Sequence, residues 1–227
     1  MSDLIPSFRD SVLVPLSEPA GDILEIGIDA LLENDALKTL PFVNTVVGLC
    51  KVGVNLHERN LLRQTAAFIT AVNNGTIDPE KLEQHRVALE EDPRRAEKEL
   101  GRVLIILGNQ VDVYQSRVLG SFYRAFLQGS ISWDKFCELS EANSRMFSAD
   151  YAVLLKIHEP MGFLSPAKDT YQIDRLVSLG LLKSTSVSRS EIENLISYQN
   201  ETMQITTPKF PGVQLTSFGK TFLQHMP

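Results

Sequence analysis

The segment LPFVNTVVGLCKVGVNL, Leu40–Leu56, is the most apolar stretch of the chain and contains one charged residue, Lys51. Its uncharged run from Thr39 to Cys50 spans 12 residues, whereas a helix needs about 20 apolar residues to cross a membrane. We therefore expect a helix that packs inside a folded domain, with Thr39 as its N-cap and Pro41 in its first turn.

Two other interpretations of this segment stay open. Gly48 and Gly53 would let a second helix approach closely, so the segment can form an interface with a protein partner or a second copy of the chain. The candidate interface residues are Phe42, Val46, Val47, Cys50 and Val54. In the other interpretation the segment is buried at first and enters a membrane after a trigger, as membrane-damaging helical effectors require.

The composition restricts the class of protein. The chain has 227 residues, of which 43% are hydrophobic, so it can form a core and general disorder is not expected. Its formal charge of -6 disfavours undirected binding to nucleic acids or anionic membranes. Cys50 and Cys137 are not at metal or redox spacing, and the N-terminal MSDLIPSFRDS has no signal-peptide pattern, so we expect reduced thiols and a cytoplasmic location.

Helix signals dominate the first 160 residues, because apolar residues recur at spacings of three and four. A helix is predicted after Ser17, and another is predicted to end at Val72 after a polar break at His57–Asn60. Asp78-Pro79 and Asp92-Pro93 each predict an N-cap followed by the first turn of a helix. A long amphipathic helix is predicted from Arg94 to Phe126, and Ser132 caps the next helix, which extends to Ile157 with a break near Ser148.

The stretch EPMGFLSPAK, residues 159–168, predicts a domain boundary because it holds two prolines and a glycine. Residues 1–160 carry 16 Lys/Arg and 23 Asp/Glu, whereas residues 161–227 carry 6 and 5. The expected fold is mainly α, with a multi-helix N-terminal bundle over residues 1–160 and a small winged-helix-like α+β module over 161–227. Its predicted elements are a helix at Tyr171–Leu182, strands at Met203–Thr207 and Val213–Thr216, and a helix at Ser217–Met226.

A winged-helix-like module raises the hypothesis of DNA binding. Its candidate contacts are Lys183, Arg189, Lys209 and Lys220. Glu191, Glu193 and Glu201 lie in the same region and argue against a basic recognition helix. Many modules of this kind serve protein docking instead.

No catalytic, metal or cofactor site is predicted. The four histidines His57, His85, His158 and His225 are not at two-ligand spacing, and we expect them to be surface or capping residues. The run EEDPRRAEKE, residues 90–99, is typical of a capped and solvated first helical turn. LQGSISWDKF, residues 127–136, lacks the oxygen ligands of a calcium loop, and no P-loop, GxSxG or CxxC motif occurs. An enzyme would be recognised only if folding brought His and carboxylate side chains into one pocket.

Several stretches together carry a resemblance to known proteins. They are EPAGDILEIGIDALL, LPFVNTVVGLCKVGVNLHERNLLRQTAAFI, FYRAFLQGSISWDKFCELSEANSRMFSADYAVL, LVSLGLL and LTSFGKTF. The chain resembles small, mostly uncharacterised bacterial helical proteins and, more distantly, the abortive-infection alpha type found among phage-defence genes. This resemblance implies a bacterial cytosolic protein that acts in defence through a partner or the cell envelope, and it brings no catalytic residues.

The leading functional expectation is a non-enzymatic protein–protein interaction protein, without a cofactor, that belongs to a bacterial phage-defence system and binds a protein partner or forms a homo-oligomer. The alternatives are a winged-helix DNA-binding regulator and a conditional membrane-damaging effector.

Overall fold

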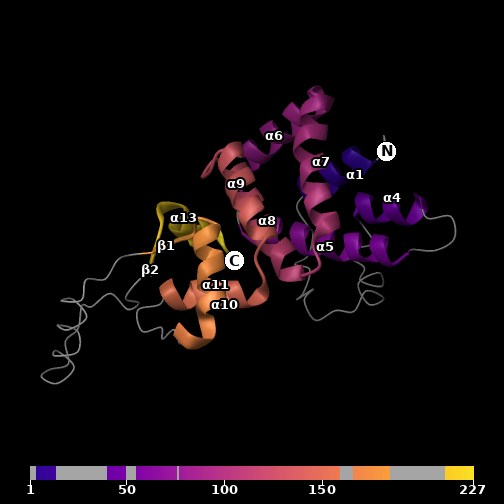
Figure 1. Ribbon diagram of the computed structural model, residues 1–227. Coiled ribbons are helices and arrows are strands. Elements are labelled where there is room, and N and C mark those ends of the chain that lie inside the picture. The colour runs from indigo at the N-terminus through magenta and orange to yellow at the C-terminus, as the bar shows by residue number, and fades with distance from the viewer. Residues whose placement is uncertain (1–3, 14–39, 50–54, 76, 159–165, 185–212) are drawn as a thin grey trace, which may run out of the picture. The chain divides into compact units, whose positions relative to one another are not determined.

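The computed structural model describes residues 4–13, 40–49, 55–75, 77–158, 166–184 and 213–227 (Figure 1). These residues contain ten helices and two short strands, so the mainly α fold is confirmed for them. The chain divides into two compact units, Met1–Arg145 with His225–Pro227, and Met146–Gln224. The predicted boundary at residue 160 thus falls inside the second unit.

The described part of the first unit is entirely helical. The helices are α1 (Leu4–Leu13), α4 (Pro41–Leu49), α5 (Leu56–Asn73), α6 (Pro79–Glu91), α7 (Pro93–Asn109), α8 (Val113–Leu127) and α9 (Trp133–Ser144). The helix predicted after Ser17 lies outside the described residues. Three predicted N-caps are confirmed, because the side chains of Asp78, Asp92 and Ser132 each accept a backbone N–H of the following first turn.

The predicted polar break at His57–Asn60 is wrong, because these residues form the first turn of α5. Asn55 caps this turn by accepting the N–H of Glu58 at 3.0 Å, while its own N–H donates to the Glu58 carboxylate at 2.8 Å. This reciprocal capping box satisfies two backbone donors, so a polar sequence begins the helix without a break.

The single long helix predicted from Arg94 to Phe126 is also wrong. The chain leaves the helix at Gln110, whose ψ of 144° is extended, and Asp112 caps the new helix α8 by accepting the N–H of Tyr114. The amide of Asn60 donates to the Gln110 carbonyl, and the amide of Gln64 donates to the Val111 carbonyl. Side chains of α5 therefore satisfy backbone groups that the break leaves without helical partners.

The core of the first unit contains a continuous set of aromatic side chains. Phe8 contacts both Phe42 and Phe68, with ring centroids 5.2 and 5.9 Å apart, and Tyr123 contacts both Phe68 and Phe136 at 5.6 Å. These rings come from α1, α4, α5, α8 and α9 and are all fully or almost fully buried. Their burial supplies much of the apolar contact that joins the five helices.

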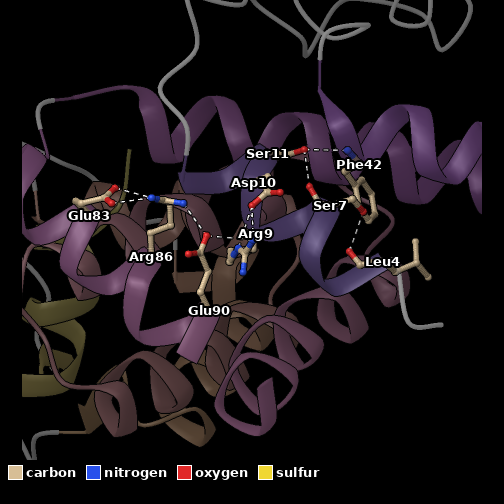
Figure 2. Close-up of polar contacts among 9 residues, drawn as sticks. All are labelled: Leu4, Ser7, Arg9, Asp10, Ser11, Phe42, Glu83, Arg86 and Glu90. Carbon is tan, nitrogen blue, oxygen red and sulfur yellow. Dashed lines mark hydrogen bonds and ion pairs between the residues drawn. The ribbon is translucent and has the colours of Figure 1, made fainter. Parts of the chain in front are cut away.

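Polar contacts join α1 to its neighbours (Figure 2). The buried hydroxyl of Ser11 accepts the N–H of Phe42 at 2.9 Å and donates to the Ser7 carbonyl at 2.9 Å, so a side chain of α1 satisfies an N-terminal donor of α4. On the outer side, Arg9 contacts Glu90 of α6 at 3.3 Å, and Glu90 also pairs with Arg86. Such exposed ion pairs add little stability.

The second unit contains α10 (Ser148–His158), α11 (Pro166–Ser178), β1 (Leu182–Ser184), β2 (Val213–Leu215) and most of α13 (Ser217–His225). A buried ion pair joins its first two helices, because both carboxylate oxygens of Asp150 accept from Arg175 at 2.8 Å. Asp150 is fully buried. This pair explains why α10 belongs with the C-terminal part of the chain.

The two strands pair antiparallel, with Leu182 opposite Leu215 and Ser184 opposite Val213. The predicted strand at 213–216 and the final helix are confirmed. The helix predicted at Tyr171–Leu182 is α11, which begins earlier, at Pro166, and ends at Ser178, and Leu182 begins β1 instead. The predicted strand at Met203–Thr207 lies outside the described residues. A mainly helical fold with a two-stranded sheet is thus established, and the winged-helix topology stays a prediction.

Candidate functional site

An open cavity of about 940 Å³ follows α7 in the first unit, and we call it the α7 groove. Residues from α1, α4, α5 and α9 complete its lining. The lining includes Leu4, Ile5, Leu61, Glu97, Lys98, Gly101, Arg102, Leu104, Ile105, Gly108, Trp133 and Glu141.

The α7 wall of the groove is mainly apolar, and two of its residues are glycines, which have no side chain. Ile105 is 67% exposed, and the preceding residue, Leu104, is half-buried. Gly101 and Gly108 lie one turn to either side of Leu104 and Ile105, and a Cβ added at Gly108 would meet no atom within 4 Å among the described residues. The backbone of α7 is therefore open to close approach by another helix.

A second cluster lies inside the unit. The Glu99 carboxylate, which is almost fully buried, contacts Nε2 of His85 at 2.6 Å and accepts the hydroxyl of Tyr123 at 2.7 Å through the same oxygen. These residues belong to α6, α7 and α8. His85 and a carboxylate do converge here, but neither lines the cavities described in this unit. We interpret this cluster as a buried polar link between three helices, because its groups satisfy one another's hydrogen bonds.

The predicted surface role of His85 is therefore wrong, and Glu99 is not part of a solvated turn. The sequence contains a signal for both positions. Glu99 follows Ala96 by three residues and precedes Val103 by four, so it lies on the buried stripe of α7, and His85 lies between Leu82 and Leu89 on the inner face of α6. A carboxylate on such a stripe predicts a buried partner.

Burial, together with the adjacent Glu99 carboxylate, raises the pKa of the Tyr123 phenol well above its ordinary value near 10. The folded state thus holds this proton more tightly than the unfolded state. The resulting stability is fully present below pH 10 and is lost as the pH rises further.

In the Tyr123→Phe variant, the free energy of unfolding should fall less steeply above pH 10 than in the wild type. At neutral pH the variant should be less stable by about 1–2 kcal/mol, because Glu99 loses a hydrogen-bond donor. Urea unfolding at pH 8 and at pH 11 measures both effects. Tyr171→Phe is the control, since Tyr171 is 65% exposed. An alkaline fall that is equally steep in the Tyr123 variant would contradict the expectation.

The structure describes three of the five predicted interface residues. Phe42 and Val46 are buried, at 1% and 5% exposure, and Phe42 also reaches the edge of the α7 groove. Val47 is 42% exposed. Cys50 and Val54 lie outside the described residues.

Of the candidate DNA contacts, Lys183 lies exposed on β1 and Lys220 lies exposed on α13. Arg189 and Lys209 lie outside the described residues. Among the other histidines, His57 lines the α7 groove, His158 is exposed at the end of α10, and partial burial lowers the pKa of His225.

Within the described ranges, no group of three or more His, Cys, Asp or Glu side chains is placed to hold a metal ion. In the same ranges, no helix is both long enough and apolar enough to cross a membrane. Comparisons of the chain with protein families, curated proteins and solved structures find no match.

Proposed function

We propose that this chain is a non-enzymatic protein-interaction protein whose α7 groove receives an amphipathic helix of a protein partner. The observation that carries the proposal is the apolar wall formed by exposed Ile105 and half-buried Leu104 between Gly101 and Gly108. Exposing apolar surface to water is unfavourable, so covering this wall with a partner is favourable.

A helix fits this groove better than an extended peptide. The α7 lining extends from Glu97 to Asn109, which at about 1.5 Å per residue gives roughly 18 Å, or three turns. All lining residues that the structure describes belong to helices, so they offer an extended peptide no strand edge to pair with. A partner helix would place apolar residues from successive turns against Leu104 and Ile105.

The sole tryptophan of the chain, Trp133, lines the groove and provides an internal reporter. The probe is a blocked 18-residue peptide with leucines three and four positions apart and alanine and glutamine elsewhere. We expect a saturable change in Trp133 emission. Ile105→Asp should weaken binding at least about tenfold, because it puts a charge into the apolar contact.

The matched control is Val87→Asp, which introduces the same charge at an exposed residue of α6 outside the groove. It should leave the affinity unchanged. The proposal is overturned if wild-type protein gives no saturable change up to millimolar peptide, or if the two variants weaken binding equally.

The wider biological expectations go beyond this proposal. A role in bacterial phage defence, a cytoplasmic location, a homo-oligomer, DNA binding through the tail and conditional membrane damage stay predictions from the sequence. If the phage-defence role holds, the helix that enters the α7 groove belongs to another component of that system.

A further inference from the structure

The two edges of the α7 groove differ in charge. Lys98 and Arg102 lie one turn apart on α7, both are exposed, and neither forms an ion pair among the described residues. The acidic residue contributed by α9, Glu141, is already paired with Arg145 at 2.5 Å. Two unpaired cations therefore border the groove on one side.

These two cations lie on the α9 side of α7. Burial raises the pKa of the Cys137 thiol on α9, and the nearby charges of Arg102 and Lys98 oppose that rise. Asp134 of α9 also lies near this thiol but does not line the groove. Glu97 also lines the groove, but it lines a separate cavity of about 420 Å³ with Arg9 of α1 as well, so it lies toward α1 and away from α9.

We infer that the partner helix carries acidic residues along one edge of its apolar face, and that Lys98 and Arg102 select it by pairing with that edge. This inference rests on the proposed function of the α7 groove. The chain as a whole is negative, with a formal charge of -6, so a general attraction would favour a basic partner. We therefore expect the groove to prefer an acidic helix, although the net charge of the chain would favour a basic one.

Three peptides with the same leucine pattern test this preference. One has glutamine along both edges, one has glutamate along a single edge, and one has lysine along that edge. At 50 mM salt, Trp133 emission should report binding in the order glutamate, glutamine, lysine, with on the order of tenfold between the first and last. The difference should shrink as salt is added.

Arg102→Glu should remove or reverse this order, whereas Lys156→Glu should preserve it. Lys156 lies on α10 and gives the same change in net charge, but it does not line the groove. Both side chains are exposed, so neither change disturbs the core.

The outcomes separate the two proposals. If all three peptides bind equally or the lysine peptide binds best, the charge preference is overturned and the groove proposal stands. If none binds, both are overturned. Equal loss of the preference in the Arg102 and Lys156 variants would also reject selection at the groove.

Discussion

Gly120→Ala is expected to destabilise the first unit by about 3 kcal/mol or more. A Cβ at this position of α8 would lie 2.5 Å from the carbonyl oxygen of Phe68 and 2.8 Å from the Cβ of Ala71. Both atoms belong to α5 and neither is the end of a flexible side chain. The two helices must therefore separate to accept one methyl group.

This crossing matters because α5 and α8 make the most extensive contact between helices in the unit. Separation at Gly120 would loosen the ring contact between Phe68 and Tyr123 and expose buried apolar surface. Interiors are close-packed, so small shifts of a helix lose many contacts at once.

Chemical unfolding followed by circular dichroism measures the effect. The matched control is Gly108→Ala, which is also inside a helix but has open space around its added Cβ. It should raise the unfolding free energy by about 0.5–1 kcal/mol, because alanine favours helix over glycine. Similar stability of the two variants would show that α5 and α8 do not cross closely at Gly120.

Gly219→Ala is expected to release α13 from the β1–β2 sheet in the second unit. The added Cβ would lie 2.1 Å from the Leu181 carbonyl oxygen, which is closer than any tolerated contact. That oxygen also accepts the N–H of Thr216 at 3.1 Å. A shift that relieves the clash therefore weakens the link between the start of α13 and the start of β1.

Amide hydrogen exchange of the full chain tests this expectation at the level of single elements. Amides of β1 and β2 should lose protection by orders of magnitude, whereas those of α5 and α8 in the first unit should keep theirs. Gln224→Ala, an exposed change on the same helix, is the control. Retained protection at Leu182 and Leu215 in the Gly219 variant would contradict the expected clash.

Local signals made several elements predictable. An Asp or Ser that caps a following turn acts over three residues, so the starts of α6, α7 and α9 could be inferred from Asp78, Asp92 and Ser132 alone. The reciprocal cap formed by Asn55 and Glu58 is equally local and could have been recognised. A polar composition was mistaken for a break there.

Other features depend on residues that are distant in sequence. The apolar stripe of α7 and α8 continues through Gln110, and periodicity alone does not reveal the extended ψ that divides them. Strand β1 forms because Val213–Leu215 pairs with it from about thirty residues away. The contact of His85 with Glu99 likewise requires α6 to fold back on α7.

The sequence by itself determined that this chain is mainly helical, where several of its described helices begin, and that its most apolar segment is too short to cross a membrane. Capping and hydrophobic periodicity act within a few helical turns, so they can be recognised in the sequence alone. Only the tertiary structure decided that Glu99 is buried, that Gly120 is a helix crossing and that Ile105 stays exposed beside a groove. Burial depends on which helices pack together, and that packing is set by many weak contacts between distant residues.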